Sequence, residues 1–175
     1  MMKAKPEVRN HVAEMVDIDR LRPHPQNYRV HPEAQREQIK ESLRANGTYR
    51  NVVAARDWTV LAGHGVIEAA RELGLAQVPV VRLPVGPDSK AALKILAGDN
   101  ELARLAEVDD AQLLAILRRI GEADLLGSGF TAESFAELEK LLNPAAPGEF
   151  PLVGEDLPTD FKCPKCGFQW SGKPS

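Results

Sequence analysis

Hydrophobic residues along this 175-residue chain alternate with polar ones in some segments and recur every three or four positions in others. Short apolar or alternating runs predict four β-strands, at residues 15–18, 52–53, 59–61 and 78–82. A helical period predicts helices at residues 33–46, 66–73, 89–96, 109–120 and 131–142. Strands and helices therefore mix in the first half of the chain, and only helices follow.

The segment 51–74 carries the strongest local signal. A turn at residues 56–57 separates its two strands, and Gly63, His64 and Gly65 join the second strand to a helix. Glycines at such a junction let the backbone bend sharply and approach a ligand closely. The first amides of the helix are free to bind an anion. Two interpretations remain, a phosphate-binding corner centred on His64 or an ordinary glycine-containing turn.

Further short motifs precede and follow this junction in a fixed order. They comprise Ile18, Leu21, Pro23, Pro25, Asn27 and Arg29, then Ser42, Leu43 and Gly47, then Gly63, His64, Ala69 and Ala70, and last Val78, Pro79 and Val80. In this order they resemble the N-terminal domain of the ParB family, also called a ParB-like nuclease domain, whose fold is shared with sulfiredoxin. The resemblance implies an α+β fold with a small mixed sheet flanked by helices.

Three later segments resemble the short form of this domain found in phages and mobile elements, alone or in front of DNA adenine methyltransferases. They lie at residues 62–74, 96–106 and 129–142, and they extend the resemblance to about residue 142. We expect an N-terminal extension at 1–14, the ParB/sulfiredoxin-like domain at 15–106 and a helical extension at 107–142. A DNA-reading helix-turn-helix is not expected, because the last helix carries three Glu against one Lys.

The resemblance implies binding of cytidine triphosphate, whose phosphates are held in the family by arginines, and arginine forks suit phosphate oxygens. Here the motif at residues 63–66 contains no arginine. The later phrase keeps Asn100 but displaces its arginine, Arg104, by one position. The expected nucleotide- and phosphate-binding residues are Arg29, Arg50, Gly63, His64, Gly65, Asn100 and Arg104, with Mg²⁺ beside the triphosphate. Sulfiredoxin activity is not expected, because Gly63 occupies the position of its catalytic cysteine.

Three functions remain open. The first is a nucleotide-binding protein that handles DNA in a phage, plasmid or mobile element, with slow hydrolysis of the triphosphate. The second is a nuclease with His64 and Glu68 as catalytic residues, although few carboxylates are near to hold a metal ion. The third is a non-catalytic accessory of a DNA methyltransferase.

Composition narrows these choices. A hydrophobic content of 43% supports a folded core, and a net charge of −3 argues against a DNA clamp that covers the whole surface. Any DNA contact must then come from a local patch within the basic first third of the chain. Arg36, Lys40 and Arg44 recur every four residues, and we expect them on one solvated stripe of their helix. No apolar run is long enough to span a membrane, and we expect a cytoplasmic protein.

The composition changes in the last 33 residues of the chain. Prolines and glycines at residues 143–160 predict a linker. The tail at 161–175 contains Cys163 and Cys166 in a C-P-x-C-G motif, which is half of a zinc ribbon. Because these are the only two cysteines, three interpretations stay open: two chains share one Zn, a partner protein supplies the other ligands, or the motif no longer binds metal. A redox dithiol is less favoured, because the surrounding thioredoxin-like pattern is missing.

Overall fold

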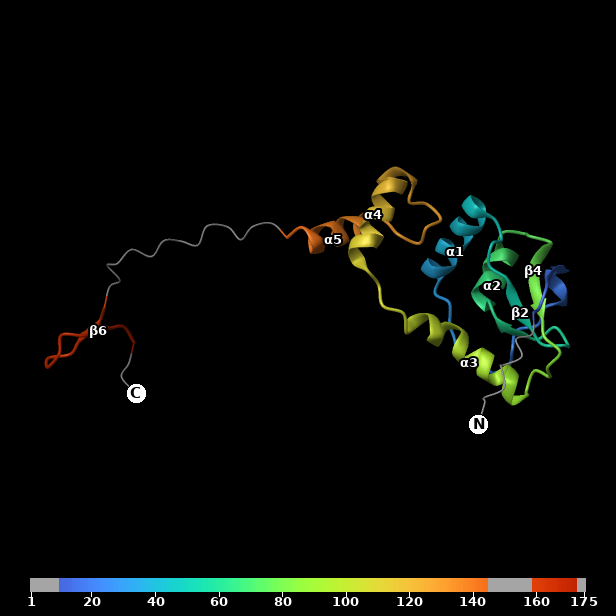
Figure 1. Cartoon of the computed structure of the whole chain (residues 1–175), viewed down its shortest axis with the longest axis horizontal. Coiled ribbons are helices and arrows are strands. Elements are labelled where there is room, and N and C mark those ends of the chain that lie inside the picture. Colours follow the sequence, from blue (N-terminus) through green and yellow to red (C-terminus); the bar gives the residue numbers. More distant parts are fainter. Residues whose placement is uncertain (1–9, 145–158, 173–175) are drawn as a thin grey trace, which may run out of the picture. The chain divides into compact units, whose positions relative to one another are not determined.

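The structure is a computed structural model that describes residues 10–144 and 159–172. The chain forms two compact units, Met1–Leu142 and Asn143–Ser175. Within the described residues, the first unit holds a four-stranded sheet and five α-helices, and the second holds a two-stranded hairpin (Figure 1). The predicted α+β fold class is therefore confirmed. The predicted linker at 143–160 lies mostly outside the described residues.

The sheet of the first unit is mixed, as expected. Its strands are β1 (Ala13–Asp17), β2 (Val52–Ala54), β3 (Val60–Ala62) and β4 (Gln77–Arg82), in the spatial order β1-β4-β2-β3. β4 pairs antiparallel with β1 and parallel with β2, and β2 pairs antiparallel with β3. The first strand ends one residue earlier than predicted, because Ile18 begins the 3₁₀ turn η1 (Ile18–Arg20).

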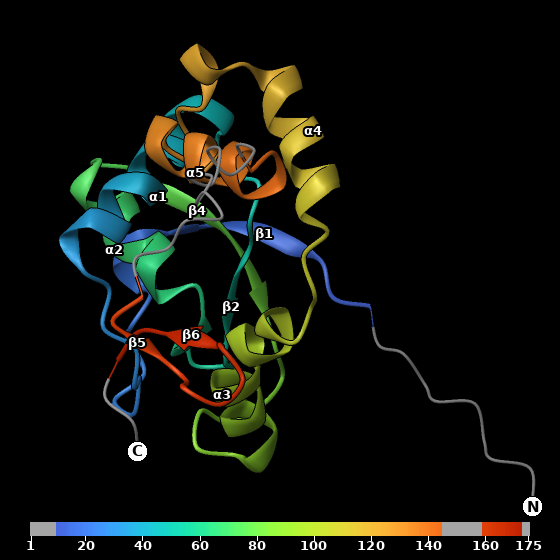
Figure 2. The same ribbon diagram turned by 90° about the vertical axis from the view of Figure 1, so that its left-hand side faces the viewer.

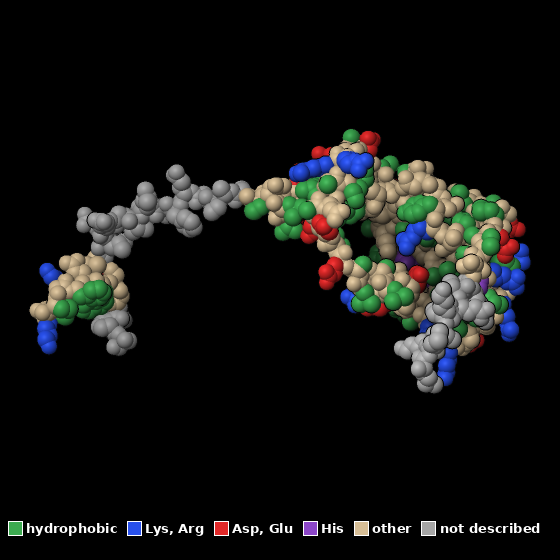
Figure 3. All heavy atoms as spheres, viewed as in Figure 1, with side chains coloured by type: hydrophobic (Ala, Val, Ile, Leu, Met, Phe, Trp, Pro, Cys, Tyr) green, Lys and Arg blue, Asp and Glu red, His purple; other side chains and the backbone are tan. Residues whose placement is uncertain are grey.

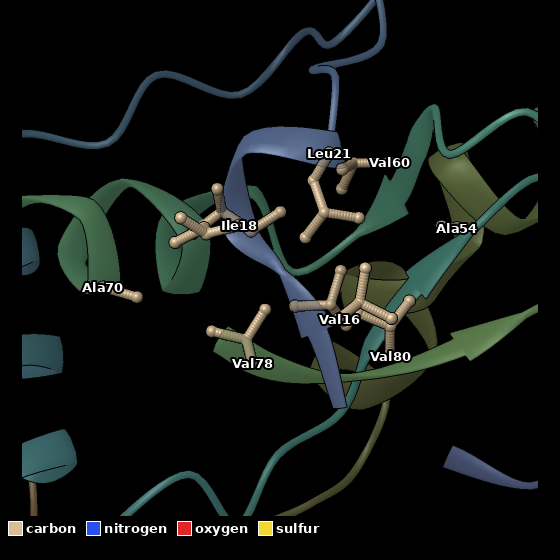
Figure 4. Packing of buried hydrophobic residues seen from close by; sticks show 10 residues of the cluster. Val16, Ile18, Leu21, Ala54, Val60, Ala70, Val78 and Val80 are labelled. Atoms are coloured by element: carbon tan, nitrogen blue, oxygen red, sulfur yellow. The ribbon is translucent and has the colours of Figure 1, made fainter. Parts of the chain in front are cut away.

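One face of the sheet forms the main core. Its largest members are valines of the four strands, with Ile18 and Leu21 of the segment after β1, and Figure 4 shows these side chains pointing toward one another. Helix α2 (His64–Glu72) adds Ile67 and Ala70 to this core. Helix α1 (Glu33–Asn46) lies outside α2 and reaches the same core through Leu43 (Figure 1). The predicted bounds of α1 are confirmed.

The opposite face is covered by α3 (Lys90–Arg104). Because side chains alternate along a strand, Val53 and Leu61 point away from the main core. They pack with Ala92 and Ile95 of this helix in a second hydrophobic cluster. The short strands β2 and β3 are thus buried on both sides. This explains why their sequences are continuous apolar runs.

Helix α3 corrects one expectation from the sequence. The helix predicted at residues 89–96 was expected to end before Gly98, but it continues unbroken from Lys90 to Arg104. The hydroxyl of Ser89 caps its first turn by accepting a hydrogen bond from the amide of Ala92 at 3.2 Å. A glycine inside a helix costs about 1 kcal/mol relative to alanine. After Gly98, an ion pair of Glu101 with Arg104, three residues apart on the helix, supports its last turn.

The basic stripe predicted on α1 is also different in the structure. Arg36 and Lys40 do not point freely to solvent, because both pair with Glu72 of α2 at 2.8 Å. These ion pairs, with the pairing of Lys40 to Glu37, hold the pKa of Lys40 above and that of Glu72 below their usual values. They fix α1 against α2. Only Arg44 remains exposed as expected.

Helices α4 (Asp110–Ile120) and α5 (Ala132–Leu142), with the 3₁₀ turn η2 (Glu122–Asp124) between them, build a separate small core. Its buried residues are Leu114, Leu117, Leu125 and Phe135. Side chains cap both helices, because Asp109 and Thr131 accept hydrogen bonds from the backbone amides of Gln112 and Ser134. This part touches α1 where Asn46 Nδ2 donates to the carbonyl of Gly127 at 3.1 Å. Figure 2 shows the two helices beside α1.

The second unit is a hairpin of β5 (Phe161–Lys162) and β6 (Gln169–Trp170), which pair antiparallel. Its turn contains Cys163 and Cys166, both of which are free thiols. Among the described residues of both units, no helix is long and apolar enough to cross a membrane.

Candidate functional site

The candidate site is a cleft at the end of β3, where four separate segments meet. The segment before α1 contributes Asn27, Arg29 and His31, and the segment before β2 contributes Arg50. The start of α2 and the middle of α3 form the other walls. The cavity has a volume of about 160 Å³. Figure 3 shows a hollow in this face of the molecule, with Lys or Arg and His side chains at its margin.

The floor of the cleft is the start of α2. Gly63 precedes this helix with a φ of +90°, a left-handed conformation that favours glycine. No side chain caps the helix, and the first amide that bonds back along the chain is that of Ile67, to the carbonyl of Gly63. The amides of residues 64–66 thus have no partner within the helix, and these residues line the cleft. Free amides at the positive end of a helix bind anions.

Position 65 has no room for a side chain, because the ring of His31 lies close to it. A Cβ atom at this position would lie 2.9 Å from Nδ1 of His31, which is closer than real Cβ contacts. Nδ1 of His31 also lies 3.2 Å from Oε1 of Gln35 on α1. The glycine therefore lets the imidazole of His31 lie directly over the first turn of α2, at the wall of the cleft.

Two arginines give the cleft positive charge. Arg29 and Arg50 both line it, and Asp99 and Asn100 of α3 face them from another wall. The side chain of Asn27 shapes the segment that carries Arg29, since its Oδ1 accepts from the amide of that residue at 3.3 Å. The continuation of α3 through Gly98 is what brings Asn100 to the cleft.

A second cavity of about 230 Å³ adjoins the first. The two share Gln35, Ile39, Arg50 and Val66. The second extends along α1 to Leu43 and Tyr49, and on to the segment 127–129 before α5. One cavity thus offers charges and amides, while its neighbour offers largely hydrophobic and uncharged side chains. Such a pair suits a ligand with an anionic end and a flat, less polar end.

His64 lines the cleft at the start of α2, and the residue is only 8% exposed. Its Nε2 lies 3.3 Å from the backbone amide of His24, from which it accepts a hydrogen bond. Burial, with smaller contributions from the charges of His31 and His24, lowers the pKa of His64 to about 4. The ring is therefore neutral at pH 7 and carries its proton on Nδ1. It anchors the segment before α1 to the start of α2.

The other predicted residues divide between the cleft and places outside it. Gly63, Gly65, Arg29, Arg50 and Asn100 come together as expected.

Glu68 instead lines a smaller cavity of about 90 Å³, together with Arg71 and part of His64. Arg104 does not line the cleft and pairs with Glu101 on the exposed side of α3 at 2.7 Å. Within residues 10–144 and 159–172, no three His, Cys, Asp or Glu side chains gather as a metal site requires.

The cysteine pair lies in a tight turn of the hairpin. Hydrogen bonds from the backbone amides of Cys166 and Lys165, and one with the Cys166 thiol, lower the pKa of the Cys163 thiol. The amide of Gly167 donates to the carbonyl of Cys163 at 2.9 Å, and Gly167 has a φ of +80°. The hairpin turn therefore contains both cysteines of the C-P-x-C-G motif.

A second charged surface was missed in the sequence. The indole of Trp58 lies between the guanidinium groups of Arg20 at 4.3 Å and Arg82 at 4.4 Å. Arg22 pairs with Asp57 next to it, and Arg56 accepts a hydrogen bond from Arg82 at its carbonyl. Trp58 has a φ of +70° and is the one non-glycine residue of the described chain with a positive φ. We call Arg20, Arg22, Arg56 and Arg82 around Trp58 the arginine patch.

Sequence reasoning also missed His31, Gln35 and Asn51, which line the cleft. The close approach of His31 to Gly65 connects positions 34 residues apart in the sequence, and no local pattern reveals it. The arginine patch joins residues between positions 20 and 82, and no local pattern reveals it either.

No model of a protein family matches the sequence, and no curated protein matches it. Several solved structures do match the structure of this chain. One is the C-terminally truncated chromosome-partitioning protein ParB from Caulobacter crescentus complexed with CTP-gamma-S, with a TM-score of 0.61 at 18% identity. That match covers 75% of this chain and 78% of the other.

Two further matches have lower TM-scores. A Pnob8-like ParB-N domain matches with a TM-score of 0.48 at 18% identity, over 77% of this chain and 62% of the other. The Caulobacter crescentus protein complexed to the centromeric parS site matches with 0.44 at 22% identity, over 78% and 74%. The comparison of folds therefore rests on the first structure. The mixed sheet, the helices on its two faces and this match together confirm the prediction: the chain has a ParB-like fold.

Proposed function

We propose that this protein binds a nucleoside triphosphate in the cleft and uses it in the handling of DNA in a phage, plasmid or mobile element. The observation that carries the proposal is the meeting of the free amides of α2 with Arg29 and Arg50 in one cavity. The likeness in fold to a ParB protein complexed with CTP-gamma-S supports the same ligand class.

The triphosphate fits the polar cavity. Its oxygens would accept from the amides of residues 64–66 and from the two guanidinium groups, which replace the arginines missing from the motif at residues 63–66. His31 and Asn100 add hydrogen-bonding groups at the walls. Asp99 offers a carboxylate oxygen, the kind of ligand that Mg²⁺ prefers beside phosphates.

The base and sugar fit the adjoining cavity along α1. Arg50 lies at the boundary of the two cavities, where it can reach the phosphate nearest to the sugar. Hydrolysis should be slow, because the cleft has a single carboxylate and the Nε2 atom of His64 already accepts a hydrogen bond. The nucleotide would then act as a switch whose bound state persists.

Titration of the purified protein with CTP, UTP, ATP and GTP in the presence of Mg²⁺ tests this proposal by calorimetry. We expect one triphosphate to bind more tightly than the others. Arg50→Ala should weaken that binding by about tenfold or more, because a hydrogen bond to a charged group contributes roughly 1.5–3 kcal/mol. Arg44→Ala removes the same charge from an exposed part of α1 outside both cavities and serves as the control. Absence of heat with all four triphosphates would refute the proposal.

DNA binding is proposed separately, at the arginine patch. Four exposed arginines lie close together there, although the whole chain carries a net charge of −3. Stacking on Trp58 holds two guanidinium groups in place, so that less side-chain entropy is lost when a phosphate binds. A residue held at an unfavourable φ in such a cluster is consistent with a functional role.

Fluorescence anisotropy with a labelled DNA duplex at several salt concentrations tests the patch. The double substitution Arg20→Ala and Arg82→Ala should weaken binding uniformly across sequences and make the dependence on salt shallower by about one unit per lost phosphate contact. Arg119→Ala on α4, another exposed arginine, is the matched control. Equal binding by the double variant and the control would show that DNA does not use this surface.

A further inference from the structure

The hairpin of the second unit holds two thiols in a geometry ready for metal. The amide of Cys163 donates to the carbonyl of Phe168 at 2.7 Å, and that of Gly167 donates back to the carbonyl of Cys163. These two bonds close a tight turn that contains both Cys163 and Cys166. Two sulfur atoms so placed can occupy adjacent corners of a tetrahedron around Zn²⁺.

The hairpin cannot complete that tetrahedron by itself. Cys163 and Cys166 are the only cysteines of the chain. In the described part of the chain, no third His, Cys, Asp or Glu joins them. Two of the four histidines, His24 and His64, are buried and hydrogen-bonded within the first unit. A structural zinc site needs four ligands, and the described residues of the hairpin supply two.

The hairpin also leaves a hydrophobic surface uncovered. The ring of Trp170 stacks with those of Phe161 and Phe168, at centroid distances of 5.8 and 6.2 Å. Phe168 is 67% exposed and Phe161 41% exposed. A two-stranded hairpin alone is marginally stable in water and needs a hydrophobic face packed against something else. Covering the three rings would supply that packing.

Charge favours a second hairpin of the same kind. Four thiolates around Zn²⁺ carry a net charge of −2. Lys162 and Lys165 lie within three residues of the cysteines, and a second copy would bring two more lysines. The negative thiolates and the positive lysines of such a site attract one another. Without the metal, the two hairpins would repel each other through their lysines. The metal would thus be needed for the contact.

We propose that two copies of this chain join through their hairpins around one zinc ion, which is held by Cys163 and Cys166 of each copy. The four thiols lose their protons when the metal binds, and no electron transfer is involved. The stacked rings of the two copies cover one another beside the metal. The result is a dimer whose existence depends on zinc and which carries two nucleotide clefts.

The test uses the full chain, stripped of metal with a chelator and kept reduced. Titration with Zn²⁺, followed by light scattering after gel filtration, should double the mass at one zinc ion per two chains. Co²⁺ used in place of Zn²⁺ should give the absorption bands of a tetrahedral site with four thiolates. This second measurement needs no variant and therefore cannot fail through misfolding. Chelator should restore the monomer.

Variants identify the ligands. Cys163→Ser and Cys166→Ser should each abolish both the change in mass and the cobalt spectrum, while His11→Ala, at an exposed histidine of the first unit, should change neither. One zinc ion bound per single chain would overturn the proposal, as would a cobalt spectrum with fewer than four thiolates. A dimer that survives both the chelator and Cys163→Ser would also overturn it. Nucleotide titration of the same variants separates this proposal from that of the cleft.

Discussion

Two glycines two positions apart shape the start of α2 in different ways. Gly63 is needed for its own backbone, because its φ of +90° lies in the left-handed region. Gly65 has an ordinary helical backbone, and it is needed for its neighbour, since the ring of His31 occupies the space of a side chain. The two glycines thus allow the sharp bend before α2 and let the ring of His31 lie at the wall of the cleft.

Gly65→Ala should weaken nucleotide binding while the protein stays folded. The new methyl group would displace the half-buried ring of His31, which can move, and the wall of the cleft would change. We expect a loss of affinity on the order of tenfold, which corresponds to about 1.4 kcal/mol. Calorimetric titration measures it.

Gly98→Ala is the matched control. A Cβ atom at Gly98 would meet nothing within 4 Å, and the residue lies inside a helix. Alanine there should raise the free energy of unfolding by about 0.4–1 kcal/mol. An unchanged affinity for Gly65→Ala, or a destabilised Gly98→Ala, would contradict the assigned roles.

Because His64 is buried, we expect the free energy of unfolding to depend on pH in a specific way. The pKa of His64 falls from 6.5 in the unfolded chain to about 4 in the folded protein, because it is buried. Between pH 4 and 6.5 the unfolded chain binds more protons than the folded protein. The contribution of the neutral His64 ring to the free energy of unfolding is therefore complete above pH 6.5 and is lost as the pH falls toward 4. Urea unfolding at pH 7 and at pH 5 measures the loss.

In His64→Gln this part of the pH dependence should disappear, whereas His11→Gln, at an exposed residue, should keep it. An equal loss of stability between pH 7 and 5 in wild type and His64→Gln would show that the ring is not buried as described.

At the scale of elements, α3 extends further than its local pattern indicated. Its helical period predicted a helix at residues 89–96, and the helix continues through Gly98 to Arg104. The pairing of Glu101 with Arg104 supports the added turn. The bounds of α1 were predicted correctly, since a clear apolar period and a following glycine identify both ends. The contacts of Arg36 and Lys40 with Glu72 were not predictable, because they join two helices.

Ser89→Ala tests the contribution of α3. The hydroxyl of Ser89 accepts from the amide of Ala92, and the loss of an N-terminal cap costs about 1 kcal/mol. The free energy of unfolding in urea should decrease by that amount, and Ser89→Gly should lose less because glycine is tolerated at this position.

Because α3 brings Asn100 and Asp99 to the cleft, nucleotide affinity should also decrease slightly in Ser89→Ala. Equal stability of Ser89→Ala and wild type would show that the cap does not support the helix.

At the scale of the whole molecule, the chain consists of two compact units. Every residue that lines the cleft lies between positions 27 and 100, in the first unit. Both proposed zinc ligands lie in the second unit. The two proposed activities therefore rest on separate parts of the chain, and each can be removed without the other.

A chain that ends at Leu142 should bind the nucleotide with the affinity of the full protein, and it should no longer bind zinc. Calorimetry with the nucleotide and light scattering with and without Zn²⁺ make the comparison. A loss of nucleotide affinity on truncation would mean that the second unit takes part in the site.

The sequence alone determined the order of strands and helices, the glycine-bounded start of α2, and the resemblance to a ParB-like fold. These features depend on neighbours within a few residues, where hydrophobic period and backbone preference dominate. The tertiary structure decided which residues face the cleft. It moved Glu68 and Arg104 outside, brought in His31, buried His64 and joined four arginines around Trp58. Such contacts join distant segments, and they are fixed only when the whole sheet and its helices pack together.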